Sequence, residues 1–182
     1  MEMRGEYRIS VPREKIWRAL NDPEILRRSI PGCQEVEKVT DNHFTAKIAA
    51  KVGPVKAVFV GSVTLSDLHP PDHYTISGEG KGGPAGFARG RAQVTLTPDG
   101  DCTLLSYTVN ATVGGKLAQI GSRLIDAAAR KMAEQFFGAF VEAVDGTVPS
   151  ESRPLSQIAP IIWVTILIVS VVTIMLCFSA VD

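Results

Sequence analysis

The sequence is poor in the residues that mark several common functional classes. Its 182 residues include three cysteines and three histidines, and Lys+Arg and Asp+Glu are both 19, so the formal net charge is zero. Cys33, Cys102 and Cys177 are too few and too far apart for a disulfide framework or a zinc knuckle. A neutral chain without a basic run lacks the electrostatic footprint of a nucleic-acid binder. We therefore expect a protein of a reducing compartment that has no nucleic-acid partner.

One long apolar run is present, near the C-terminus. Residues 161–180 contain no charged residue and consist mostly of Ile, Val and Leu. A helix of about 20 residues is roughly 30 Å long, which matches the hydrocarbon core of a bilayer. A buried core helix is the alternative, but this run has no polar face to turn to solvent. We expect one transmembrane helix over residues 158–181, with Trp163 near a membrane interface.

The expected span divides the chain into three parts. Residues 147–157 are rich in Pro, Ser and Thr, as in a flexible linker, and residues 1–146 are long enough for one domain with its own core. Arg153 precedes the span and Asp182 follows it, which favours the cytoplasmic side for the domain. The charged N-terminus lacks the apolar core of a signal peptide. We expect a single-pass protein of the cytoplasmic membrane whose N-terminal domain lies in the cytoplasm.

Apolar and polar residues alternate in several segments of this domain. The alternation predicts strands over residues 3–11, 43–52, 55–65, 74–81, 86–97 and 105–113. Period-two alternation is typical of antiparallel strands that have one buried face and one solvated face.

Helical spacing predicts two short helices and one long one. Pro12 opens the first short helix, and Asp22 caps the second, which begins with Pro23. Residues 116–144 carry an apolar stripe and form the long helix. A long amphipathic helix and a curled antiparallel sheet can bury their apolar faces only against each other. The expected fold is therefore α+β, a helix-grip architecture in which the sheet wraps around the long C-terminal helix.

Two neighbouring strands carry unusually small residues on the expected inward face. The set is Gly78, Gly80, Gly82, Gly86, Ala88, Gly90 and Ala92. Glycine weakens a strand, so such a cluster needs a reason. Close approach of the helix backbone or strong bending of the sheet is one explanation, and volume kept for a ligand is the other. Both remain open from the sequence.

Larger apolar residues are expected to line this volume, although each is also an ordinary core residue by type. The wall candidates are Phe44, Phe59, Tyr107, Leu124, Met132, Phe136 and Phe140. Together with Gly78, Gly80, Ala88 and Gly90 they form the predicted ligand-binding set.

Residues that would support catalysis or metal binding are sparse. His69 and His73 flank a Pro-Pro turn with only Asp72 beside them, and His43 faces outward on its strand. The run of glycines over residues 78–83 lies in a strand and does not open a helix, unlike a dinucleotide-binding loop. We expect no catalytic residue and no metal site.

Several motifs are shared with one known family. They read Pro-Arg-Glu-Lys-Ile-Trp (12–17), Asn-Asp-Pro-Glu (21–24), Ile-Pro-Gly-Cys (30–33), Lys-Val-Gly-Pro-Val-Lys (51–56), Tyr-Thr-Ile-Ser-Gly-Glu-Gly-Lys-Gly-Gly (74–83) and Gly-Gly-Lys-Leu-Ala-Gln-Ile-Gly-Ser-Arg-Leu-Ile (114–125). Over residues 1–145 the chain resembles the CoxG family of carbon monoxide dehydrogenase subunits.

The resemblance implies a START-like fold of the SRPBCC superfamily. It also implies a non-catalytic subunit that associates with an aerobic molybdenum carbon monoxide dehydrogenase or a related molybdenum hydroxylase. Such a subunit recruits the enzyme to the membrane and couples it to the quinone pool. The expected ligand is a quinone, menaquinone or ubiquinone, or another lipid, with no covalently bound cofactor. A purely structural anchor or assembly factor, and a cyclase- or hydrolase-type enzyme on the same fold, are the alternatives.

Overall fold

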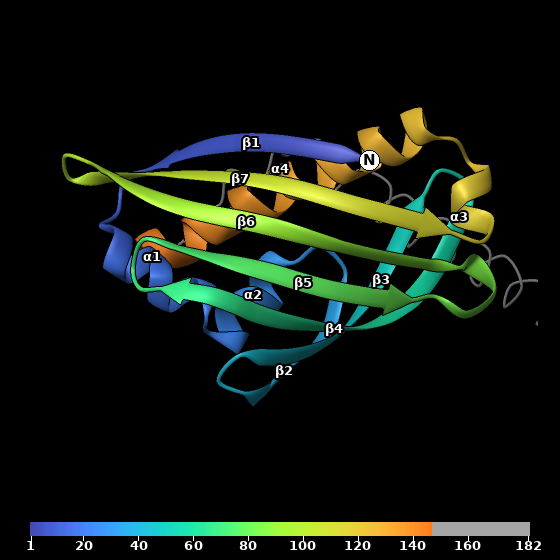
Figure 1. Ribbon diagram of the computed structural model, residues 1–182, viewed down its shortest axis with the longest axis horizontal. Coiled ribbons are helices and arrows are strands. Elements are labelled where there is room, and N and C mark those ends of the chain that lie inside the picture. Colours follow the sequence, from blue (N-terminus) through green and yellow to red (C-terminus); the bar gives the residue numbers. More distant parts are fainter. Residues whose placement is uncertain (147–182) are drawn as a thin grey trace, which may run out of the picture. The chain divides into compact units, whose positions relative to one another are not determined.

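The alternating segments pair into one seven-stranded antiparallel sheet (Figure 1). The structure is a computed structural model that describes residues 1–146. The strand order across the sheet is β1-β7-β6-β5-β4-β3-β2. The strands are β1 (Glu2–Ile9), β2 (Cys33–Thr40), β3 (His43–Val52), β4 (Val55–His69), β5 (His73–Lys81), β6 (Phe87–Asp99) and β7 (Cys102–Gly114). The helices are α1 (Arg13–Leu20), α2 (Pro23–Ser29), the 3-10 helix η1 (Gly83–Ala85), α3 (Lys116–Gln119) and α4 (Ser122–Asp145).

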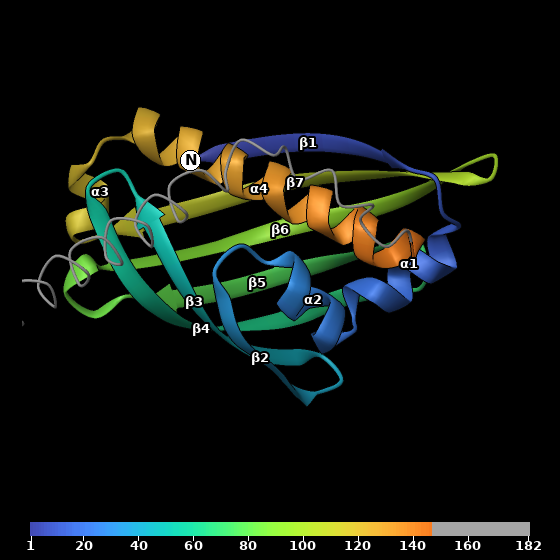
Figure 2. The same ribbon diagram turned by 180° about the vertical axis from the view of Figure 1, so that it is seen from behind.

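The sheet curls around α4, which lies along its concave side (Figure 2). The short helices α1 and α2 cover one end of the same side, and α2 packs against α4. Strand pairing places Tyr74 opposite Val94, and Val94 opposite Tyr107, so the inward residues of successive strands share one face. This arrangement confirms the helix-grip fold expected from the sequence.

The two short helices begin where the sequence predicts. The carboxylate of Asp22 accepts a hydrogen bond from the backbone N–H of Glu24, at 2.9 Å, and Pro23 occupies the first helical position. A capping carboxylate satisfies an N–H that has no partner within the helix. The cap therefore fixes the start of α2 beside the end of α1.

Two features of the elements differ from the expectations. The alternation does not predict strand β2, because only Cys33 and Val36 of its eight residues are even half-buried. The predicted helix over residues 116–144 is divided into α3 and α4, because Gly121 adopts a φ of 92° that a continuous helix does not allow. The division shifts the buried face of α4, so that Phe137, Phe140 and Val144 are its buried residues.

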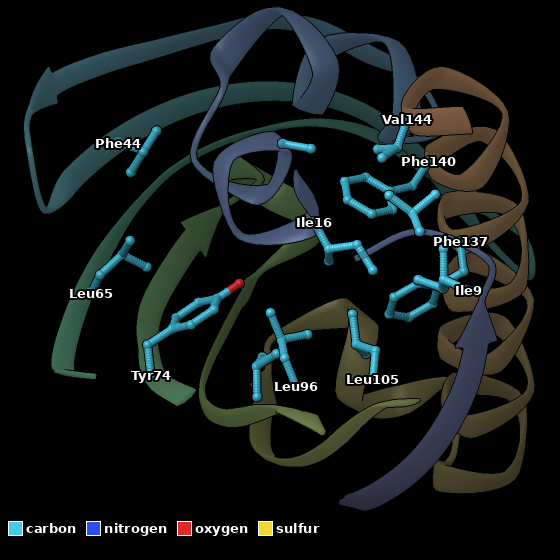
Figure 3. Packing of buried hydrophobic residues seen from close by; sticks show 13 residues of the cluster. Ile9, Ile16, Phe44, Leu65, Tyr74, Leu96, Leu105, Phe137, Phe140 and Val144 are labelled. Atoms are coloured by element: carbon cyan, nitrogen blue, oxygen red, sulfur yellow. The ribbon is translucent and has the colours of Figure 1, made fainter. Parts of the chain in front are cut away.

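The densest packing lies where α1 meets the sheet and the C-terminal half of α4. Ile16 of α1, which has no exposed surface, lies between Leu96 and Leu105 of the sheet and Phe140 of α4 (Figure 3). At this end the hydroxyl of Thr103, also fully buried, donates a 2.7 Å hydrogen bond to the carbonyl of Val11. Close packing of this kind leaves little room for a ligand at the α1 end.

The C-terminal parts of the chain lie beyond this description. Within residues 1–146, no helix combines the length and apolar character needed to cross a membrane. The predicted linker, residues 147–157, and the predicted span, residues 158–181, lie outside the described residues.

Candidate functional site

Small residues form a continuous patch on the concave face of the sheet. The register places Gly78 opposite Gly90, and Gly80 opposite Ala88. On the flanking strands, Gly61 pairs with Gly80, and Ala111 pairs with Gly90. We call Gly61, Gly78, Gly80, Ala88, Gly90 and Ala111 the small-residue patch. Its members are all half-buried, in contrast to the buried side chains at the α1 end.

Atoms next to the glycines show why side chains are small here. A Cβ at Gly61, Gly78 or Gly90 would lie 2.7–3.0 Å from a backbone carbonyl oxygen of a neighbouring strand. These glycines therefore permit the strong bending of the sheet. A Cβ at Gly80 would meet nothing within 4 Å. None of the atoms nearest these four positions belongs to α4. Bending of the sheet and open volume thus both apply, at different glycines, whereas close approach of the helix does not.

Alanine substitutions should separate these two roles. Gly90→Ala should lower the free energy of unfolding by about 1–3 kcal/mol, because the new methyl group overlaps the carbonyl oxygen of Asn110. Gly80→Ala should leave stability unchanged or raise it by up to about 1 kcal/mol, because the methyl group enters open space and the unfolded chain loses freedom. Urea denaturation of the full chain in detergent measures both. Equal losses for the two variants would contradict the open space at Gly80.

An aromatic cluster separates the patch from the dense core. The ring of Phe137 stacks on Tyr7 at a centroid distance of 4.0 Å and on Tyr107 at 5.6 Å. Phe136 meets Phe137 edge to face at 5.0 Å. The ring of Tyr107 lies across β1 at Gly5, where a Cβ would be only 2.6 Å from its Cζ. The cluster presents flat apolar surfaces and tyrosine hydroxyls next to the small-residue patch.

The electrostatics of the tyrosines favour their neutral forms. Burial raises the pKa of Tyr107 above its ordinary value, the nearby Tyr7 adds to the increase, and Arg130 opposes it. Burial also raises the pKa of Tyr74 well above its ordinary range. A neutral tyrosine hydroxyl can both donate and accept a hydrogen bond. The concave face therefore offers polar contacts without charge on these rings.

A pocket of about 300 Å³ opens between the end of β7 and the start of α4. It is lined by Met1, Ala111, Thr112, Val113, Ala118, Ser122, Ile125 and Asp126. We call it the edge pocket. The Oδ1 atom of Asp126 is buried and has no hydrogen-bond partner in the part of the chain that the structure describes. A buried carboxylate oxygen is costly without a partner, so it marks a place for a hydrogen-bond donor.

A larger hollow, of about 690 Å³, lies on the opposite, convex face. Its lining includes the outward residues Ser77, Glu79, Arg89, Asn110 and Thr112. Such a polar and charged surface does not suit an apolar ligand, which needs predominantly apolar walls. Size alone therefore does not identify the site, and the concave face has the more suitable chemistry.

The predicted ligand-binding residues fall into three groups. Phe44 and Phe140 belong to the dense core, with 6% and no exposed surface respectively, so their role is packing. Leu124 is 52% exposed, so the expectation that it points inward is wrong. The break at Gly121 explains this, because it changes the phase of the helix. The remaining members are half-buried: Phe59, Gly78, Gly80, Ala88, Gly90, Tyr107, Met132 and Phe136.

Sequence reasoning missed several residues that the structure places at the site. Phe137 is the centre of the aromatic cluster, and Asp126 lines the edge pocket. Both follow the break at Gly121, whose effect on the helix face the periodicity alone does not show. Gly61 is masked by the larger residues around it on β4, although its inward position follows from the alternation.

Comparison with known proteins identifies the family. The family model for CoxG of carbon monoxide dehydrogenase matches residues 5–145. The chain belongs to the CoxG family. The family name describes an accessory component of carbon monoxide dehydrogenase, and the match covers nearly all of the described domain. A search of curated proteins found no significant match.

Solved structures show the same fold as this CoxG domain. A conserved protein from Geobacillus kaustophilus is 32% identical with a TM-score of 0.76, covering 80% of this chain and 96% of that one. A protein from Thermus thermophilus is 17% identical with a TM-score of 0.62, covering 80% and 98%. The ZhuI aromatase/cyclase from Streptomyces is 13% identical with a TM-score of 0.60, covering 84% and 98%. The last two identities support the START-like fold alone.

Proposed function

We propose that this CoxG protein is a non-catalytic, membrane-anchored subunit that carries a quinone or another lipid for an aerobic molybdenum carbon monoxide dehydrogenase or a related molybdenum hydroxylase. The observation that carries the proposal is the open space at Gly80 within a concave face of small and aromatic residues. Interiors are normally close-packed, so open volume beside half-buried apolar walls favours a bound apolar ligand.

The chemistry of the concave face suits a molecule with an apolar tail and a small polar head. Each Å² of apolar tail removed from water contributes roughly 25 cal/mol, so an isoprenoid chain of menaquinone or ubiquinone supplies ample binding energy. We place the tail over the small-residue patch. The head then lies in the edge pocket, where Asp126 accepts a hydrogen bond from it, with Ser122 and Thr112 also within the lining.

The membrane part of the proposal rests on the sequence. An apolar run over residues 161–180 has the length of a bilayer span, and residues 147–157 have the composition of a linker. A tether of this kind keeps the carrier near both the bilayer and the enzyme, and it raises the effective concentration of each without a new contact. Family membership supports carbon monoxide dehydrogenase as the partner.

Lipid analysis of the purified protein tests this function. The full chain is purified from its own membranes in mild detergent, extracted with organic solvent and examined by mass spectrometry. We expect close to one quinone or other lipid per chain. The same tail, residues 147–182, purified alone in that detergent, is the control for lipid held by the apolar run. Equal amounts on the full chain and the tail would contradict a carrier and leave only an anchor.

A further inference from the structure

The charges of this neutral chain are unevenly distributed. Residues 43–66, 80–98 and 102–125 contain no Asp or Glu, although each stretch contains Lys or Arg. By contrast, the turns that join β4 to β5 and β6 to β7 carry Asp67, Asp72, Asp99 and Asp101. A zero net charge therefore conceals two surfaces of opposite sign.

The fold brings the basic stretches together at one end of the sheet. The tip of the β3–β4 hairpin, the helix η1 and the helix α3 all lie at this end in both views (Figures 1 and 2). A Cβ at Gly53 of the hairpin would lie 3.4 Å from Ile120, which follows α3, and η1 contacts both α3 and β4. We call this the α3 end of the domain. The four Asp residues of the two turns lie at the opposite end, beside α1 (Figure 1).

Cationic side chains surround the α3 end. The group, here called the basic rim, is Lys51, Lys56, Lys81, Lys116 and Arg123, and all five are exposed. Lys81 forms a 2.9 Å ion pair with Glu79 of its own strand. For the other four, no carboxylate within residues 1–146 lies at salt-bridge distance. The rim therefore presents an excess of positive charge.

Large apolar side chains are exposed among these cations. Val58 and Val60 of β4 are 43% and 60% exposed, Phe87 of β6 is 37% exposed, and Leu124 at the start of α4 is 52% exposed. Register places Val60, Lys81 and Phe87 side by side across three strands. Exposed apolar side chains that gather on one surface mark an interaction site.

We propose that the α3 end docks on an anionic lipid surface. Lysines beside exposed Val, Leu and Phe are the composition of segments that lie in a membrane interface, where the apolar groups enter the headgroup boundary and the cations meet anionic lipids. A partner protein with an acidic surface would match the lysines but would not require the exposed valines. The edge pocket, with Ala118, Ser122 and Ile125 in its lining, opens at this same end. Docking thus turns the pocket towards the bilayer, which is a contact separate from any anchor at the C-terminus.

Hydrogen–deuterium exchange of the full chain tests the docking. The protein is mixed with vesicles of pure phosphatidylcholine or of phosphatidylcholine with about one-third phosphatidylglycerol. We expect the anionic vesicles to slow exchange in residues 51–60, 81–89 and 116–124 and to leave α1 unchanged. Raising the salt concentration should reverse the protection, because surface charges are screened. The comparison holds whether or not the tail inserts, since both vesicle types would receive the tail.

Charge substitutions make the test specific. Each lysine near an anionic surface contributes about 1 kcal/mol, so the double variant Lys51→Gln/Lys56→Gln should weaken docking roughly thirtyfold. The double variant Lys15→Gln/Arg28→Gln removes the same charge from α1 and α2 and should dock as the wild type does.

Three outcomes would overturn docking: equal protection with both vesicle types, equal losses for the two double variants, or protection of the basic rim by the partner enzyme alone without lipid. None of them alters the lipid-extraction result, so the docking and carrier proposals fail independently.

Discussion

Replacing Phe140 with alanine should lower the free energy of unfolding by about 3–5 kcal/mol. The side chain has no exposed surface, and its ring lies 5.6 Å from that of Phe136. It packs in the dense core with Ile16 of α1 and Val144 of α4 (Figure 3). Loss of the ring leaves a cavity between three elements that cannot close without moving α4. Urea denaturation of the full chain in detergent, followed by circular dichroism, measures the change.

Phe87→Ala is the matched control for this prediction. The same atoms are removed from a phenylalanine that is 37% exposed, on the outer face of β6. Less apolar surface is returned to water, so the expected loss is below about 1 kcal/mol. Similar losses at the two positions would show that the α1 end is not the main core. The division of the concave side into a packed end and an open end would then be wrong.

Gly80→Leu should reduce the amount of co-purified lipid at least tenfold while the protein stays folded. The new side chain enters the space where a Cβ meets nothing within 4 Å, so the sheet itself tolerates it. A leucine there occupies volume that we assign to the apolar tail, and overlap with a ligand excludes it sterically. Lipid per chain, measured by extraction and mass spectrometry, is the readout.

Gly138→Leu provides the control on the same molecule. Gly138 lies on the exposed side of α4, and a Cβ there also meets nothing within 4 Å. The same residue type is therefore added outside the concave face, and lipid content should match that of the wild type. Equal lipid on both variants, with both folded, would mean that the ligand does not lie over Gly80. Loss of lipid from both would point to a general effect of added leucine.

Much of the sheet could be predicted because alternation directly reports which face a strand buries. Period two alone places Gly78, Gly80, Ala88 and Gly90 on one face, and the register confirms it. Strand β2 escapes prediction for the converse reason. It lies at the edge of the sheet and buries little, so its sequence carries almost no alternation. Physical burial, and not strand propensity, makes the difference.

The helices show where local pattern fails. The signals at Asp22 and Pro23 are local, so the start of α2 is predictable. The apolar stripe of residues 116–144 gives no sign that Gly121 takes a positive φ, and a break of this kind rotates every later residue relative to the sheet. The inward placement of Leu124 and the omission of Phe137 are both consequences of that rotation.

The nature of the small-residue patch required the fold. In sequence, Gly80 and Gly90 are equivalent, since both are inward glycines in neighbouring strands. Only the three-dimensional arrangement shows that the carbonyl of Asn110 crowds one and that the other faces open space. Likewise, the basic rim joins residues that are up to 72 positions apart, from Lys51 to Arg123, and no local window contains it.

A crystal structure of the full chain soaked with a quinone whose alkyl tail ends in bromine tests the central claim most directly. The anomalous signal of bromine locates the tail without ambiguity. We expect one bromine peak between β5 and α4, within van der Waals distance of Gly80, and none against the convex face. Bromine found only on the convex face or in the detergent belt, with side chains filling the space above Gly80, would contradict the account.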